Sequence, residues 1–157
     1  MLKKPNCPVI AIEEHYWDAE LAKTFTGVEA GKGGAIDQRL HDLGALRIKE
    51  MDEAGIDIQV LSHGAPSTQK LGPDVAVDLT RKVNDRLHAA VKQHPERFAG
   101  FAALPTAVPE AAAEELQRTT ELGFKGAMLH GLANGQFLDD KKFWPIFARA
   151  EKLDVPI

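Results

Sequence analysis

The 157-residue sequence has a single cysteine, Cys7, so it cannot form an intramolecular disulfide. This composition indicates a reducing compartment. Long hydrophobic runs are also missing. The first apolar stretch, 9–12, is ended at once by Glu13 and Glu14 and is too short for a signal-peptide core. Because nothing approaches the length of a membrane span, we expect a cytoplasmic protein with no membrane partner.

The sequence has no basic stripe. Its 19 Lys and Arg residues are interspersed with 23 Asp and Glu residues, and the formal net charge is −4. Without a basic face to neutralise phosphates, nucleic acid is not expected as a partner. The hydrophobic fraction of 44% is that of an ordinary globular protein, and the length is sufficient for one domain with a core. We therefore treat residues 1–157 as belonging to a single domain.

Short apolar runs alternate with longer stretches of helical periodicity. The expected strands are 9–14, 57–62, 98–104 and 126–130. Helices are expected over 39–54, from Pro73 to a stop at His94-Pro95, over 109–122 and over about 141–153. Gly55 and Gly123 supply two of the helix stops, and Asp139 or Asp140 supplies the cap of the last helix.

Four strands separated by four helices predict right-handed crossovers and a parallel sheet. Such a sheet is either an open doubly wound sheet or a (β/α)8 barrel. No glycine-rich phosphate fingerprint follows the first strand, which weakens the open, nucleotide-binding version. Residues 154–157 look like the start of a fifth strand, whereas a barrel needs roughly 250 residues. The predicted fold is therefore α/β, the N-terminal half of a (β/α)8 TIM barrel with four βα units, truncated before strand 5.

The chemistry depends on Glu13 and His15, at the end of the first expected strand. Alternate strand residues share a face, so both side chains point to the same side and Glu14 points to the other. The carboxyl ends of barrel strands form the active-site face. A carboxylate and a neutral imidazole two residues apart can reach one divalent cation. The alternative is a solvated strand end with no ligand.

The stretch 11–15, Ala-Ile-Glu-Glu-His, resembles the opening strand of the amidohydrolase-related decarboxylases. That group of the amidohydrolase superfamily contains γ-resorcylate decarboxylase and aminocarboxymuconate semialdehyde decarboxylase. Further segments resemble the same group in the same order, namely 47–57 leading into 60–62, Asn84-Asp85 before 95–98, 101–105 and 122–127. The resemblance covers nearly the whole sequence and is less specific for one reaction than for the superfamily.

The resemblance implies that Glu13 and His15 are ligands of one divalent metal site, with Mn or Zn bound. The family's other ligands are a His after the fifth strand, often a His after the sixth, and an Asp after the eighth that is taken as the proton donor. All of these would lie beyond Ile157, so the catalytic acid or base is unknown in this sequence.

Three further residues are candidates for substrate binding. His130 ends the fourth expected strand, where resorcylate-type relatives commonly carry Asn, and would hydrogen-bond a substrate hydroxyl or carboxylate. Its alternative role is to pair with a loop carbonyl. His63 follows the second expected strand and either lines the barrel mouth or is a solvated turn histidine. Tyr16 would wall an aromatic-acid pocket or pack against its neighbours.

The expected function is non-oxidative decarboxylation of a small aromatic or enoic carboxylic acid by a metal-dependent carbon–carbon lyase. One alternative is metal-dependent hydrolysis of an ester, lactone or amide on the same scaffold. The other is a non-catalytic truncated fragment. Two ligands on one strand make a weak site, and a half barrel exposes unpaired strand edges, so we expect this chain alone to be inactive and to self-associate as a homo-oligomer.

Overall fold

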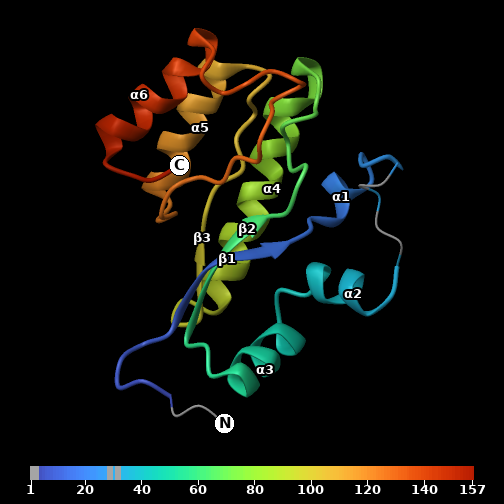
Figure 1. Cartoon of the computed structure of the whole chain (residues 1–157), viewed down its shortest axis with the longest axis vertical. Helices are drawn as coiled ribbons and strands as arrows, with labels where there is room; N and C mark the ends of the chain where they lie inside the picture. The colour runs from blue at the N-terminus through green and yellow to red at the C-terminus, as the bar shows by residue number, and fades with distance from the viewer. Residues whose placement is uncertain (1–3, 28–29, 31–32) are drawn as a thin grey trace.

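The computed structural model of the chain describes residues 4–27, 30 and 33–157. Its elements, in chain order, are β1 (Ile10–Tyr16), α1 (Ala19–Ala22), α2 (Ala35–His41), α3 (Ala45–Ala54), β2 (Ile58–His63), α4 (Pro73–Gln93), β3 (Phe98–Gly100), α5 (Pro109–Glu121), the 3-10 helix η2 (Lys141–Phe143) and α6 (Trp144–Leu153). Figure 1 shows the long helix α4 passing behind the strands, with α5 and α6 together at the upper left and α2 and α3 at the lower right.

The sheet has three strands in the order β1-β2-β3, and both pairs are parallel. This confirms the parallel sheet expected from the alternating pattern. The fourth expected strand, 126–130, is wrong as a strand, because among the described residues it forms only an isolated parallel bridge between Ala127 and Ala102. The third is shorter than expected, ending at Gly100.

The segment next to that bridge leaves no room for a side chain. Gly126 has φ 149°, and a Cβ there would lie 2.3 Å from the carbonyl oxygen of Pro156. The amide of Ala127 donates to the same oxygen at 3.1 Å. The last residues of the chain therefore run alongside 126–127, on the side opposite the bridge to Ala102.

The single helix expected over 39–54 is also wrong, because the structure has two helices, α2 and α3, separated by residues 42–44. Asp42 causes the break. Its Oδ1 accepts the amide protons of Gly44 and Arg47 at 2.9 and 3.0 Å, and so satisfies free N–H groups at the start of α3. The short helix α1 was not expected from the sequence and is capped by Asp18.

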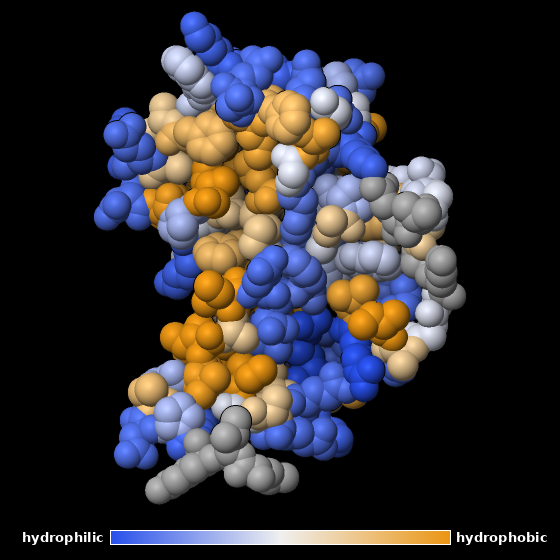
Figure 2. Space-filling model, viewed as in Figure 1, coloured by the Kyte–Doolittle hydropathy of each residue, from blue (hydrophilic) through white to orange (hydrophobic). Residues whose placement is uncertain are grey.

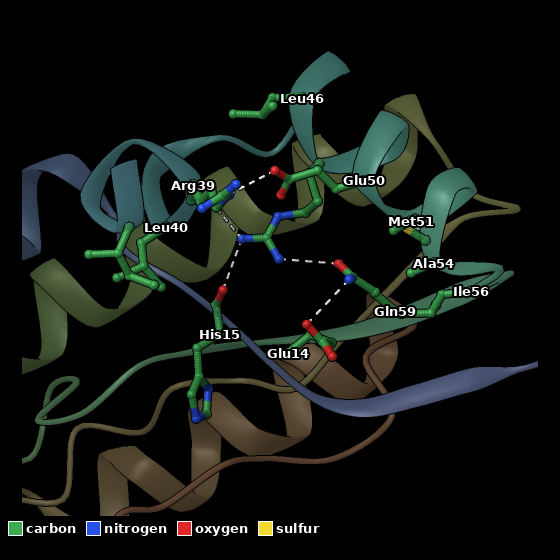
Figure 3. A pocket seen from close by; sticks show the side chains of 12 residues that line it. Glu14, His15, Arg39, Leu40, Leu46, Glu50, Met51, Ala54, Ile56 and Gln59 are labelled. Atoms are coloured by element: carbon green, nitrogen blue, oxygen red, sulfur yellow. Dashed lines mark hydrogen bonds and ion pairs between the residues drawn. The ribbon is translucent and has the colours of Figure 1, made fainter. Parts of the chain in front are cut away.

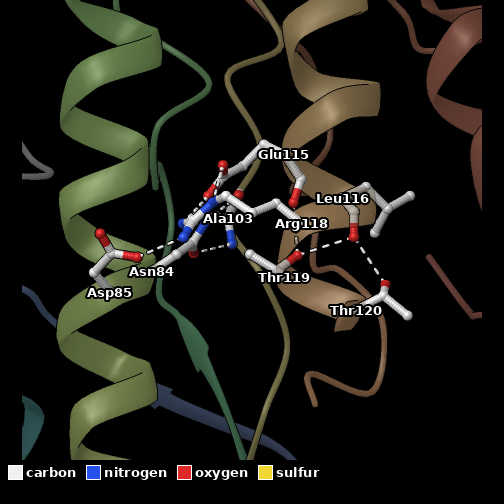
Figure 4. Close-up of polar contacts among 8 residues, drawn as sticks. All are labelled: Asn84, Asp85, Ala103, Glu115, Leu116, Arg118, Thr119 and Thr120. Atoms are coloured by element: carbon white, nitrogen blue, oxygen red, sulfur yellow. Dashed lines mark hydrogen bonds and ion pairs between the residues drawn. The ribbon is translucent and has the colours of Figure 1, made fainter. Parts of the chain in front are cut away.

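A buried polar network joins α4, α5 and the chain after β3 (Figure 4). Asn84 is fully buried, and its amide pairs with both backbone groups of Ala103, each at 3.0 Å. Asn84 also donates to Glu115 at 2.8 Å, and Arg118 closes the network on that carboxylate. Because every charge in the network is paired, burial of Glu115 is tolerated.

Apolar areas remain open on the face in Figure 2 over α5 and α6, over the start of β1 and, to a smaller extent, over α2. Large side chains that stay exposed include Ile10 and Ile12 of β1 and Trp144 of α6, at 51%, 66% and 55%. Among the described residues β1 pairs with β2 alone, so its outer edge is open. Within the same ranges, no helix combines the length and apolar character needed to cross a bilayer.

Candidate functional site

The C-terminal half of β1 brings Glu13 and His15 together. Glu13 Oε1 lies 3.9 Å from His15 Nε2, and the side chains are 73% and 32% exposed. Two ligands bound about 2.1 Å from one cation are about 3.4 Å apart in tetrahedral geometry and at most about 4.2 Å apart, so one divalent ion can reach both donors after a small side-chain movement. The strand is not regular, because its register with β2 shifts between Ala11 and Glu14. The two side chains nevertheless approach one another as expected.

Glu14 points to the other side of β1, also as expected. Its Oε2 accepts a hydrogen bond from Gln59 Nε2 at 3.2 Å, among residues that line a cavity of about 360 Å³ between β1 and helices α2 and α3. In Figure 3 the imidazole of His15 points away from this group of side chains. The cavity is therefore on the side of β1 away from the imidazole of His15, although His15 is among the residues that line it.

The imidazole of His15 is held from β2. Its Nδ1 lies 2.9 Å from the hydroxyl of Ser62, which is fully buried and pairs with His15 in the strand register. Burial lowers the pKa of His15, and the nearby His130 lowers it further, against the opposing effect of Glu13. The ring is therefore held in the neutral form that binds metals, with Nε2 facing Glu13.

Arg47 of α3 holds the backbone of the same histidine. Its guanidinium donates to the carbonyl oxygens of His15 at 2.9 Å, Asp42 at 2.8 Å and Arg39 at 3.1 Å, and to Gln59 Oε1 at 3.1 Å. Burial lowers the pKa of Arg47. In Figure 3 the labelled partners His15, Arg39 and Gln59 face one another from β1, α2 and β2. The buried guanidinium of Arg47 thus links the end of β1 to both helices.

His130 stands beside His15, with ring centroids 5.5 Å apart and planes at 68°. Its Nε2 lies 2.8 Å from the carbonyl oxygen of His63, so the carbonyl pairing considered from the sequence is present. This pairing places the ring next to the metal-ligand candidates rather than away from them. The structure therefore places the ring of His130 beside His15, the residue that approaches Glu13.

His63 differs from both roles considered for it, whereas Tyr16 takes the second of its two considered roles and packs against its neighbours. His63 is 2% exposed: its Nδ1 pairs with the carbonyl of Gly64 at 2.8 Å, and its Nε2 accepts the amide proton of Asp18 at 2.9 Å. It is neither a solvated turn histidine nor free to bind substrate through its ring. Tyr16 is 3% exposed and packs edge-on against His63. His63 is buried because the chain after β1 folds over its ring, through Asp18 and Phe25.

Several supporting residues were missed from the sequence. Ser62, Arg47 and Gln69 contact the backbone or ring of a candidate site residue across 47, 32 and 61 positions of sequence. Nothing in their local sequence marks them, apart from the polar Ser62 within an otherwise apolar strand. Among the described residues, no group of three or more His, Cys, Asp or Glu side chains is placed to hold a metal ion. The described residues therefore supply two candidate metal ligands, Glu13 and His15.

Comparison with known proteins gives one family and a consistent set of relatives. A model of the amidohydrolase family matches residues 10–157. The gamma-resorcylate decarboxylase of Rhodococcus jostii is 38% identical over 159 residues, a match that covers 94% of this chain and 48% of that protein. The chain thus spans about half the length of the curated relatives it matches.

Two solved structures have a similar backbone fold over nearly the whole of this chain. The 5-carboxyvanillate decarboxylase of Novosphingobium aromaticivorans, crystallised with manganese and 4-hydroxy-3-methoxy-5-nitrobenzoic acid, matches with a TM-score of 0.90 and 32% identity over 96% of this chain and 49% of that one. A 2,6-dihydroxybenzoate decarboxylase complexed with 2,6-dihydroxybenzoate matches with a TM-score of 0.84 and 35% identity over 95% of this chain and 48% of that one.

Proposed function

We propose a function from the premise that this chain belongs to the amidohydrolase family, whose model matches residues 10–157. The proposed function is metal-dependent, non-oxidative decarboxylation of a small aromatic or enoic carboxylic acid. The observation that carries the proposal is the approach of Glu13 and His15 to 3.9 Å at the C-terminal end of β1. Support comes from relatives named as decarboxylases of aromatic acids, which this chain matches over about half of their length.

In this proposal Glu13 and His15 hold one divalent cation, Mn or Zn. The donor set fits such an ion, because it offers one carboxylate oxygen and one neutral imidazole nitrogen on the same side of the strand. A relative crystallised with manganese favours Mn. When bound, the cation would act as a Lewis acid that stabilises negative charge on the reacting acid.

The other residues of the proposed site orient the metal ligand His15 or face the substrate. Ser62 fixes the ring of His15, Arg47 fixes its backbone, and His130 presents its ring to the substrate beside the metal ligands. His63 and Tyr16 support the site from beneath and do not contact substrate in this scheme. The proton donor and the remaining ligands are proposed to follow later strands, as the resemblance implies.

The chain is proposed to form the first half of a (β/α)8 barrel, and the whole protein's activity is proposed to need the second half. The open edge of β1 and the exposed side chains Ile12 and Trp144 are surfaces that further βα units would cover. With two donors in the described residues, this chain alone would bind metal weakly. Self-association through the open edges, and a cytoplasmic location, stay predictions.

The test compares ligand variants with a matched control on the same strand. In the protein that carries this chain, bound manganese and release of carbon dioxide from 2,6-dihydroxybenzoate are measured for Glu13→Gln, His15→Gln and Glu14→Gln. We expect the first two to lose on the order of 100-fold in both metal affinity and turnover. Glu14→Gln should retain metal, since Glu14 points to the opposite face.

Wild-type metal content and turnover in both Glu13→Gln and His15→Gln would refute the proposed site. Ester, lactone or amide hydrolysis without carbon dioxide release would instead favour the hydrolase alternative on the same scaffold.

A further inference from the structure

Gln69 is a buried side chain for which the proposed mechanism has so far no use. It is 2% exposed and lies in the segment between β2 and α4. Its Oε1 accepts the backbone amide proton of His130, and its Nε2 donates to the carbonyl oxygen of His130 at 3.0 Å. A side-chain amide thus pairs with both backbone groups of one residue, as a neighbouring strand would. It does so two residues after Met128, the last residue of this segment whose amide bonds to the chain after β3.

The ring of His130 is held at its other end. Its Nε2 lies 2.8 Å from the carbonyl oxygen of His63. A carbonyl can only accept, so Nε2 must carry a proton, and in the singly protonated form of the ring Nδ1 carries a lone pair. No hydrogen bond to Nδ1 comes from the residues that the structure describes. The ring stands edge-on to His15 at 5.5 Å, so this acceptor belongs to the same end of the sheet as the proposed metal ligands.

We propose that Gln69 is a positioning residue that fixes His130 so that Nδ1 accepts a hydrogen bond from a hydroxyl group of the substrate. The inference rests on the proposed function, because it assumes an aromatic acid at the Glu13–His15 site. A carboxylate carries acceptors only and would face a second lone pair at Nδ1, whereas a hydroxyl supplies the missing proton. His130 therefore selects hydroxylated aromatic acids, and the carboxylate is left to the metal site.

Asn84 provides a natural comparison for this arrangement. It is fully buried, and its amide pairs with both backbone groups of Ala103 in the same two-bonded manner. Ala103 has no polar side chain to aim, so this second amide serves only the fold. Loss of either amide removes both side-chain hydrogen bonds to the backbone of one residue, and loss of Asn84 also removes the hydrogen bond to Glu115, so Asn84→Ala should destabilise the protein at least as much as Gln69→Ala. Asn84→Ala is therefore the matched control for Gln69→Ala.

The experiment measures discrimination in the manganese-loaded protein that carries this chain. Dissociation constants are determined for 2,6-dihydroxybenzoate and 2,6-difluorobenzoate, which differ in the hydroxyl protons and little in size. We expect Gln69→Ala to reduce the preference for the dihydroxy acid roughly tenfold, the value of one hydrogen bond. Asn84→Ala should leave the preference unchanged, and in a His130→Ala background Gln69→Ala should have no further effect on it.

An unchanged preference in a Gln69→Ala protein that still binds manganese and releases carbon dioxide would overturn the inference alone. Absence of manganese binding and of carbon dioxide release in the wild type would overturn the proposed function instead. A second measurement is made on the wild type and does not depend on the folding of Gln69→Ala. The 15N spectrum of the wild-type histidines, with His130 assigned through His130→Ala, should show protonated Nε2 and unprotonated Nδ1. The opposite tautomer would overturn the inference.

Discussion

The ends of β1 and β2 lie side by side, and each carries a histidine with a different fate. His15 pairs in register with Ser62, and His63 pairs with Tyr16 one position later. The side chain of His15 is 32% exposed with Nε2 facing Glu13, whereas His63 is 2% exposed with both ring nitrogens bonded to backbone. A histidine at the carboxyl end of a strand is thus not a ligand by position alone. What decides its role is whether a ring nitrogen remains free.

The chain that follows β1 causes the difference. It turns over the end of β2, so that the amide of Asp18 donates to His63 and the ring of Phe25 packs edge-on against it at 5.9 Å. Arg86 of α4 holds this turn in place through two hydrogen bonds to the Asp18 carboxylate, at 2.6 and 2.9 Å. His15 lies outside that cover.

The largest effect expected from this comparison is on stability. His63→Ala removes a buried ring and leaves the amide of Asp18 without its partner, so the free energy of unfolding should fall by about 3 kcal/mol. His15→Ala removes a partly exposed ring with one hydroxyl contact and should cost less than about 1 kcal/mol. Urea denaturation of both variants checks the contrast. Equal losses would show that the two strand ends do not differ as the burial indicates.

Burial of His63 should also make the free energy of unfolding depend on pH. Burial lowers the pKa of His63 to about 4, against about 6.5 in the unfolded chain. The unfolded state therefore binds the proton first, and stability present above pH 6.5 is lost as the pH falls toward 4. A tenfold change in proton affinity corresponds to about 1.4 kcal/mol, so the loss from His63 reaches up to about 3 kcal/mol.

The measurement for this prediction is the free energy of unfolding between pH 7 and pH 4 in the wild type and in His63→Gln. Glutamine does not titrate, so the variant should show a smaller decline over that range, whatever its stability at pH 7. The lowered pKa of His15 contributes to both proteins in the same direction and cancels in the difference. Parallel curves would mean that His63 is protonated in the folded state as readily as in the unfolded one.

Local sequence was sufficient for features that depend on periodicity. The strands 9–14 and 57–62 and the proline-initiated helices α4 and α5 lie where the apolar spacing and the starting prolines predict them. The placement of Glu13 and His15 on one side of β1 followed from strand alternation, despite the register shift that breaks it. These features need only a backbone and its neighbours in sequence.

Features that depend on distant partners could not be predicted in this way. The break between α2 and α3 comes from one Asp42 oxygen, and the burial of His63 comes from a turn that Arg86 pins. The last expected strand, 126–130, has strand-like apolar residues, but its pairing with the chain after β3 is limited to an isolated bridge at Ala127, and the backbone of His130 pairs with the side chain of Gln69. Each case is a tertiary contact that overrides local propensity.

The smallest expected effect concerns Ser62, the residue that links the two strand ends. Its hydroxyl lies 2.9 Å from His15 Nδ1 and is the contact that orients the proposed ligand from β2. Ser62→Ala leaves both strands and both histidines in place, so the stability loss should stay near 1 kcal/mol. The affinity for manganese should fall about tenfold, because the ring can then rotate away from Glu13. Titration of the metal into wild type and Ser62→Ala measures this, with Thr80→Ala, a buried hydroxyl on α4, as the control. A tenfold loss in Ser62→Ala alone would show that β2 contributes to the site through orientation. Equal affinities would show that His15 needs no support from β2.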